Sequence, residues 1–229
     1  MKKHYKNRIQ MDDLISEQLK TPKGRANYWN SLLDEAKNYD LIDLLKNSID
    51  LDGDIIEFGV WRGLMTKRMA TVVKTSGNKK RIFACDSFEG FGEETITAHD
   101  SSLFRPISKL KKKFTAANDV PNKLNEFFKY FDLDGLCVKG FFNESLGNID
   151  RKVNYCFAHV DCDAYKSHLD CLDYVYTRML KGGCIVFDDY NKKKWPGATK
   201  AVNEFLSDKP EEIKFSDKKE NPAWYIIKT

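Results

Sequence analysis

Two apolar segments in the second half of the chain both end in paired aspartates. The first runs into Asp161 and Asp163, and the second runs into Asp188 and Asp189. If these segments are parallel strands, their carboxyl ends meet at one edge of a sheet. Carboxylates gathered there repel one another and raise one another's pKa. The sequence therefore predicts a cation at this edge.

The residues between the two aspartate pairs predict a helix. Apolar side chains recur there at three- and four-residue steps, as on one helix face. They are Tyr165, Leu169, Leu172, Val175, Tyr176 and Met179. Gly182 and Gly183 are expected to end this helix. The segment is thus predicted to be strand, helix, strand, with the two strands parallel.

The rest of the chain alternates in the same way. Strand patterns occur at 54–59, 81–85, 136–138, 155–160, 184–187, 212–215 and 224–227. Helical patterns occur around 30–47, 64–75, 121–131, 165–179 and 196–206. Strands that alternate with helices predict an α/β fold with a mainly parallel sheet. The two closing strands are expected to form an antiparallel hairpin.

Two segments differ from this alternation. Residues 1–50 are expected to form a helical layer of the same domain, packed on the sheet or over its active edge, with residues 51–229 forming the main body. Residues 88–118 show no regular pattern. A structureless connection of this length is typical of a functional lid or a partly disordered loop.

Composition excludes several classes of protein. The chain of 229 residues has 41% hydrophobic and 31% charged residues, which is typical of a soluble globular domain. A net charge of +4 is too small to indicate nucleic-acid binding. No apolar run approaches the ~20 residues of a membrane span, and no secretory signal is present. Six cysteines without a C-x-x-C pair indicate reduced thiols and a cytoplasmic location. Cys162 is also a possible soft metal ligand, but the hard oxygens around it disfavour that role.

The first strand–helix turn disfavours two nucleotide-binding classes. It runs from Gly59 to Gly63 without the G-x-G-x-x-G of dinucleotide-binding folds, and the chain contains no P-loop motif. Glu57 near this turn suits a cationic ligand, and Asp86 closes the second strand, where α/β nucleotide sites commonly hold ribose hydroxyls. S-adenosylmethionine satisfies both requirements, because it carries a positive charge and a ribose. The alternatives are that Glu57 caps the next helix and that Asp86 caps a turn before Phe88.

Several motifs in this order resemble the macrocin O-methyltransferase family. They are the stretches 56–63, 84–91, 138–142 and 160–165, followed by Gly182-Gly183 and Asp188-Asp189-Tyr190. The resemblance implies a Rossmann-like S-adenosylmethionine-dependent methyltransferase with a mainly parallel seven-stranded sheet, an antiparallel C-terminal strand and an N-terminal helical layer. It also implies a Mg²⁺-dependent enzyme, a homodimer or larger homo-oligomer, that methylates sugar hydroxyls of natural products or glycans.

The resemblance also assigns roles to residues. The cofactor-binding set it implies is Glu57 and Gly59 for the methionine part, Asp86 and Ser87 for the ribose, and Gly140, Phe141 and Phe142 beside the adenine. The implied Mg²⁺ ligands are Asp161, Asp188 and Asp189. The chain departs from the family pattern at Cys162, at Leu64, at 191–195 and in the loop 88–118. The resemblance therefore does not identify the acceptor.

Asp161 is the candidate catalytic base, with His99 and His168 as alternatives. Lysines at 109–113 and 192–194 flank the expected acceptor mouth. They suggest an anionic small-molecule or glycan acceptor, such as a nucleotide-linked or phosphorylated sugar, although lysine clusters are usually solvated surface. Methylation of a phenol, amine or phosphoryl oxygen is an alternative function. A non-catalytic subunit that binds S-adenosylmethionine is another. Asp163 is expected to cap the following helix or to support the metal ligands.

Overall fold

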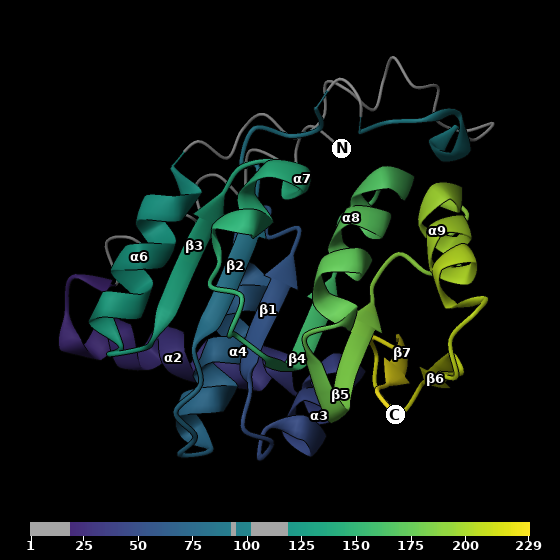
Figure 1. Ribbon diagram of the computed structural model, residues 1–229. Coiled ribbons are helices and arrows are strands. Elements are labelled where there is room, and N and C mark those ends of the chain that lie inside the picture. The colour runs from purple at the N-terminus through teal and green to yellow at the C-terminus, as the bar shows by residue number, and fades with distance from the viewer. Residues whose placement is uncertain (1–18, 93–94, 102–118) are drawn as a thin grey trace.

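The structure, a computed structural model, describes residues 19–92, 95–101 and 119–229. At its centre is a seven-stranded sheet in the order β3-β2-β1-β4-β5-β7-β6 (Figure 1). The strands are β1 (Asp54–Phe58), β2 (Ile82–Asp86), β3 (Gly135–Lys139), β4 (Tyr155–Val160), β5 (Met179–Phe187), β6 (Lys214–Ser216) and β7 (Ala223–Ile227). Strands β1 to β5 are parallel, whereas β7 is antiparallel to both β5 and β6. The predicted sheet and its C-terminal hairpin are confirmed.

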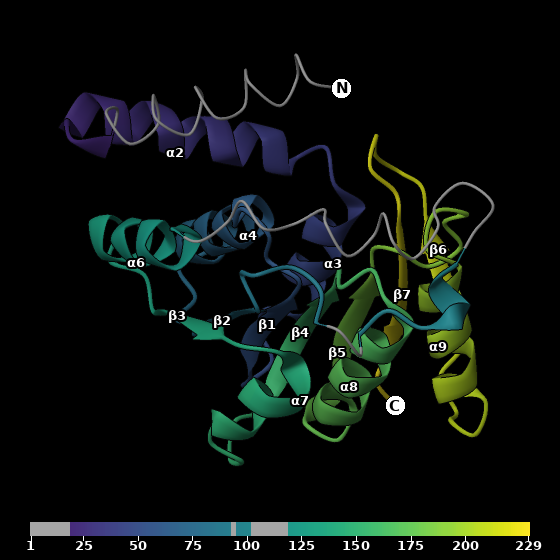
Figure 2. The same cartoon turned by 90° about the horizontal axis from the view of Figure 1, so that it is seen from above.

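Helices cover both faces of the sheet (Figure 2). One face carries α2 (Pro22–Ala36), α3 (Asp40–Ser48), α4 (Leu64–Thr75) and α6 (Val120–Tyr130). The other face carries α7 (Phe142–Ser145), α8 (Tyr165–Tyr176) and α9 (Pro196–Leu206). Side chains of a strand alternate between the faces, so Ile55 packs in the first core and Ile56 in the second. Burial on both faces explains the nearly continuous apolar strands.

The N-terminal helical layer packs on the first of these faces. Its described part, from residue 19 onward, contains α2 and α3 as separate helices, because the chain turns at 37–39 and the Asp40 N–H bonds the Asn221 carbonyl at 3.0 Å. Helix α2 lies against α4, and α3 lies against β4 and β5. No residue from 19 to 48 lines the cavity that is described in the next subsection. This part of the layer therefore packs on the sheet and not over its active edge.

Gly182 and Gly183 do not end the predicted helix. Helix α8 ends at Tyr176, and Met179 and both glycines belong to β5. The register of β4 against β5 shifts there, because Tyr155 pairs with Met179 but Phe157 pairs with Cys184. Gly182 has a φ of 83°, and a side chain on Gly183 would meet backbone oxygens. The glycines therefore permit an irregularity in the strand, which local helix signals do not reveal.

Two further observations concern the thiols and the helix lengths. All six cysteines are free, and all but Cys137 are buried, as predicted for reduced structural thiols. In the part of the chain that the structure describes, no helix combines the length and apolarity needed to cross a membrane.

Glu211 ties the end of the chain to α8. Its buried carboxylate accepts hydrogen bonds from the Tyr176 hydroxyl at 2.6 Å and the Lys228 ammonium at 2.9 Å. It also accepts the N–H of Thr229 at 3.1 Å. Burial opposes ionisation, but these hydrogen bonds lower the pKa of Glu211 to about 2. The expected strand at 212–215 accordingly starts later, at Lys214.

Gly59 brings the first turn against the end of β4. Its φ is 87°, and a Cβ at this position would lie 1.9 Å from the Asp161 carbonyl oxygen. The Asp161 N–H in turn bonds the Phe58 carbonyl at 2.8 Å. The backbones of the two strand ends therefore touch, and the position of Asp161 depends on the absence of a side chain at residue 59.

We expect Gly59→Ala to destabilise the protein more than Gly77→Ala. Gly77 also has a positive φ, of 78°, but has open space around it. The left-handed backbone alone costs about 1–2 kcal/mol for alanine, and forcing a methyl group into a filled space adds about 1–3 kcal/mol. Urea unfolding of both variants measures the difference. Equal costs would show that Gly59 does not pack on Asp161.

We expect Glu211→Gln to lower the free energy of unfolding at pH 7 by about 2 kcal/mol, because charged hydrogen bonds are lost. The pKa of Glu211 is depressed in the folded state, so its contribution is complete above the usual value near 4.5 and disappears toward about pH 2. The difference between wild type and variant should therefore shrink over that range in urea titrations. Glu212→Gln, at the exposed neighbour, is the control and should change neither quantity.

Candidate active site

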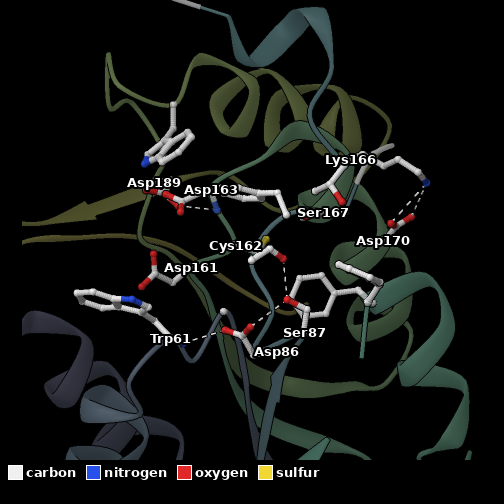
Figure 3. Close-up of a pocket in the computed structure, with 18 of the residues that line it drawn as sticks. Trp61, Asp86, Ser87, Asp161, Cys162, Asp163, Lys166, Ser167, Asp170 and Asp189 are labelled. Atoms are coloured by element: carbon white, nitrogen blue, oxygen red, sulfur yellow. Dashed lines mark hydrogen bonds and ion pairs between the residues drawn. The ribbon is translucent and has the colours of Figure 1, made fainter. Parts of the chain in front are cut away.

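A cavity of about 660 Å³ opens at the carboxyl edge of the parallel strands. Its walls come from the segments that follow β1, β2, β3, β4 and β5, which is where doubly wound sheets bind ligands. Figure 3 shows Trp61, Asp86 and Asp161 near one another, and Lys166 and Asp170 at the other end of the cavity. Residues far apart in the sequence thus meet in one space.

Asp86 lies at the end of β2 and holds two turns together. Its Oδ2 accepts the Trp61 N–H at 2.8 Å, and its Oδ1 accepts the Phe88 N–H at 2.7 Å. Both donors belong to residues with positive φ, so the carboxylate supports strained turns, and the alternative role as a turn cap is observed. Asp86 also lines the cavity. The Ser87 hydroxyl also lies 3.5 Å from Oδ1. A carboxylate has about four acceptor positions, so at least one stays open to a ligand hydroxyl.

Ser87 lies beside Asp86 in the wall of the cavity. Its hydroxyl donates to the Gly90 carbonyl at 2.7 Å and accepts the Glu89 N–H at 3.2 Å. The side chain thus closes the turn after β2. The assigned contact with a ribose stays a prediction.

Glu57 lies beneath the cavity and does not line it. The carboxylate is almost fully buried, accepts a hydrogen bond from the Thr66 hydroxyl and lies 3.0 Å from His159 Nδ1. Glu57 therefore joins β1, α4 and β4 from within the core. It does not cap α4, whose first residues have no side-chain cap. The assigned contact between Glu57 and a methionine group stays a prediction.

The segment after β3 forms another wall of the cavity. Gly140, Phe141 and Phe142 all line the cavity. Gly140 has a φ of 139°, and the ring of Phe142 packs edge-on against Phe58 with centroids 5.9 Å apart. The three residues assigned to the adenine therefore lie in the same cavity as Asp86.

Three carboxylates converge at the ends of β4 and β5. Asp161, Asp188 and Asp189 each place an oxygen within 4.8 Å of the others. Asp189 is buried and accepts the Asp163 N–H at 3.0 Å, whereas Asp188 is partly exposed and pairs with Lys192. Asp163 does not cap α8, whose N-cap is Ala164. The expectation that Asp163 supports the other carboxylates is met through its backbone.

Burial and neighbouring charges shift the pKa values of these three carboxyl groups. Burial, and then the charges of Asp188 and Asp189, raise the pKa of Asp161 well above its usual value. Burial opposes ionisation of Asp188 as well, but the Lys192 ammonium lowers its pKa. Burial and Asp188 raise the pKa of Asp189. Without a metal ion, burial and repulsion therefore favour protonation of Asp161 more strongly than protonation of Asp188.

The three candidate bases occupy different environments. His99 is exposed and packs on the Tyr165 ring at a centroid distance of 4.6 Å. His168 is fully buried beneath the cavity, where its Nδ1 lies 3.4 Å from Cys162 Sγ. Neither histidine lines the cavity, whereas Asp161 does. Asp161 is the candidate base that faces the space for an acceptor, and the Cys162 thiol contacts a histidine instead of joining the carboxylates.

The described part of the loop 88–101 forms a packed wall. Phe91 packs against Trp195, with ring centroids 6.1 Å apart, and both residues line the cavity. Asp100 is fully buried, accepts the Tyr165 N–H at 2.7 Å and so anchors the loop to the start of α8. Residues 102–118, with the lysines at 109–113, lie outside the described residues.

Several residues in the site were not predicted. They are Trp61, Lys166, Ser167, Asp170 and Trp195, which line the cavity, and Asp100, which anchors its wall. Asp100 had a readable signal, because Thr97 and Asp100 form a capping box around η1 (Ala98–Asp100). Lys166 and Ser167 follow the aspartates of β4 in the first turn of α8, a position that faces the sheet edge. Trp195 had no comparable signal.

Comparison with known proteins places this site in a family. The family model described as macrocin-O-methyltransferase (TylF) matches residues 39–216. The chain is 28% identical over 141 residues to the 8-demethyl-8-(2,3-dimethoxy-alpha-L-rhamnosyl)-tetracenomycin-C 4'-O-methyltransferase of Streptomyces olivaceus, covering 60% of this chain and 53% of the relative. It is 27% identical over 160 residues to the mycinamicin III 3''-O-methyltransferase of Micromonospora griseorubida, covering 67% and 60%. The matches thus span little more than half the length of these relatives.

Solved structures show the same fold. The calicheamicin methyltransferase CalS11 has a TM-score of 0.75 at 20% identity, over 96% of this chain and 91% of that one. The O-methyltransferase NovP has a TM-score of 0.65 at 24% identity, over 82% and 79%. The fold is that of Rossmann-like S-adenosylmethionine-dependent methyltransferases, and the family match covers most of the chain. The chain belongs to the macrocin O-methyltransferase family.

Proposed function

We propose that the protein is an S-adenosylmethionine- and Mg²⁺-dependent O-methyltransferase acting on a hydroxyl of a sugar or glycan-type acceptor. The observation that carries this proposal is a single cavity holding Asp86, Gly140 and the Asp161 carboxylate. Family membership supports the reaction class. The name of the Streptomyces olivaceus relative includes a rhamnosyl group, and both relatives are named as O-methyltransferases.

The donor occupies the side of the cavity above β1, β2 and β3. Asp86 accepts the ribose hydroxyls, with Ser87 beside it, and Gly140 to Phe142 border the adenine. Gly59 leaves the backbone of the first turn open to the methionine part. The negative edge formed by the aspartates favours a cationic sulfonium nearby, because opposite charges attract strongly in a partly buried site.

The three aspartates suit a magnesium ion. Mg²⁺ prefers hard oxygen ligands and retains positions for water or substrate, and Asp161, Asp188 and Asp189 offer three carboxylate oxygens within 4.8 Å of one another. Sulfur and nitrogen ligands are not part of this cluster. When bound, the metal acidifies and orients the acceptor hydroxyl.

The residues of the chain then act mainly by alignment. In a methyl transfer the acceptor oxygen displaces the methyl carbon from sulfur and gives up its proton. Holding the two reactants in line supplies about 7–11 kcal/mol. Asp161 lies between the donor turn and the other two aspartates, and its carboxylate takes the proton. The buried Glu57–His159 pair beneath it holds the ends of β1 and β4 in place.

The acceptor is a sugar that carries an anionic group. Trp61, which is exposed, offers an aromatic face in the cavity, and Lys192 and Lys194 add positive charge at its edge. CalS11, whose apo structure has a TM-score of 0.67 at 18% identity, is named as a TDP-rhamnose 3'-O-methyltransferase. A nucleotide-linked sugar fits this combination of aromatic and cationic groups. A panel of substrates tests this acceptor. Methylation of a phenol, amine or phosphoryl oxygen would contradict it, and so would binding without turnover.

We expect Asp188→Asn to abolish turnover while S-adenosylmethionine binding is retained, because Asp188 belongs to the acceptor side. Loss of one carboxylate from a metal site is expected to reduce kcat by about 100-fold or more.

We expect Asp86→Asn to weaken the binding of S-adenosylmethionine and to raise its Kd by about 10- to 100-fold, because a charged hydrogen bond to the ligand contributes ~1.5–3 kcal/mol. Calorimetry and single-turnover assays separate the two effects.

Metal removal provides the matched control. EDTA should abolish wild-type turnover, and Mg²⁺ should restore it, with donor affinity unchanged. Turnover that persists in EDTA, or in Asp188→Asn, would refute the metal role. Donor binding without transfer to any member of the panel would favour a non-catalytic subunit.

We expect Lys194→Ala to raise KM for an anionic acceptor and not for a neutral one. One exposed charge contributes ~0.2–1 kcal/mol, so the expected change is about two- to fivefold. A nucleotide-diphosphate sugar and its neutral methyl glycoside form the matched pair of acceptors. Lys193→Ala, beside the cavity but not lining it, is the control. Equal effects on both acceptors would exclude an anionic subsite at Lys194.

A further inference from the structure

Lys192 is paired with the acidic cluster. Its ammonium forms an ion pair with Asp188 Oδ2 and lies 4.0 Å from Asp189 Oδ1. The Asp189 side chain is 3% exposed, while those of Lys192 and Asp188 are 47% and 44% exposed. One positive charge therefore neutralises part of a cluster of three carboxylates.

The turn that carries Lys192 is held at both ends. The Lys192 N–H bonds the Asp189 carbonyl at 3.3 Å, and the Trp195 N–H bonds the Lys192 carbonyl at 2.9 Å. Asn191 has a φ of 60°, and its N–H bonds the Thr199 hydroxyl at 2.8 Å. Trp195 itself is almost fully buried. The fold therefore fixes where the lysine side chain starts, close to Asp188.

The other lysines that line the cavity have different partners. Lys166 pairs with Asp170 at 3.4 Å, at the far end of the cavity. Lys194 lies over the Trp195 ring, 5.1 Å from its centroid. Among the described residues that line this cavity, Lys192 is the lysine whose ion pairs are with the acidic cluster.

We propose that Lys192 is a built-in counter-ion that competes with the divalent metal for Asp188 and thereby sets the metal affinity of the site. This inference rests on the metal role in the proposed function. An ammonium beside Asp188 stabilises the three carboxylates while the metal is absent, because it reduces their mutual repulsion. A divalent cation repels that ammonium, so metal binding moves the side chain away from Asp188. Lys192 is thus a positioning residue that weakens metal binding while preserving the empty site.

Metal affinity tests the competition directly. Calorimetric titration with Mg²⁺ or Mn²⁺ should give a Kd about three- to fivefold lower for Lys192→Met than for wild type, because one competing, half-exposed charge is removed. Lys192→Arg keeps the charge and should retain the wild-type Kd. Lys193→Met removes the same charge one residue away, from an exposed side chain that does not line the cavity. It should leave the Kd unchanged.

Stability and labelling provide readouts independent of affinity. Without metal, Lys192→Met should have a lower Tm than Lys193→Met, and saturating Mg²⁺ should remove this difference. Amine acylation followed by fragment mass spectrometry should show Lys192 labelled faster once Mg²⁺ is added, with Lys193 unchanged. Both results follow if the ammonium leaves Asp188 when the metal binds.

Three outcomes would overturn the inference, and they can be distinguished from one another. If wild type binds metal, but Lys192→Met and Lys193→Met have the same Kd within about twofold, Lys192 does not compete and the metal role stands. If no variant binds Mg²⁺ or Mn²⁺, the metal role in the proposed function fails together with the inference. Unchanged labelling of Lys192 upon metal binding likewise excludes its displacement.

Discussion

The structure depends on the convergence of negative charge where β4 and β5 end. Val160 pairs with Phe187, and the Asp188 N–H bonds the Val160 carbonyl at 3.0 Å, so the aspartates after the two strands are held side by side. Such proximity is unfavourable unless the charges are compensated. The Asp163 N–H that bonds Asp189 and the Lys192 ammonium that pairs with Asp188 compensate part of this charge. A single metal ion satisfies the same requirement.

The rest of the molecule serves to keep that edge in place. Glu57, His159 and Thr66 form a buried polar group beneath it. Gly59 lets the backbone of the first turn touch Asp161, and Asp100 attaches the loop wall to α8. These contacts join segments that are distant in the sequence. The geometry of the cavity is therefore a property of the packed sheet and its two helical layers.

Much of the fold could be predicted because its signals are periodic. The apolar runs and the helix faces predicted the alternating elements, and the aspartates after two parallel strands predicted a cluster of carboxylates at one edge. The helix end was wrong because a local signal had two meanings. Gly182 and Gly183 resemble a helix end but permit an irregular strand between β4 and β7. For Asp163, one of the two expected roles is observed, because its backbone supports Asp189.

The sequence by itself determined the α/β architecture, the functional residues that follow each strand and the acidic edge. The reason is that the periodicity of buried residues and the parallel connections between strands leave few other arrangements. Only the tertiary structure decided which polar groups face the cavity. It placed Glu57 and His168 beneath the surface, brought Lys166 and Trp195 into the wall, and paired Lys192 with Asp188. Those outcomes depend on contacts between distant segments, whose side-chain directions are set by packing and not by local sequence.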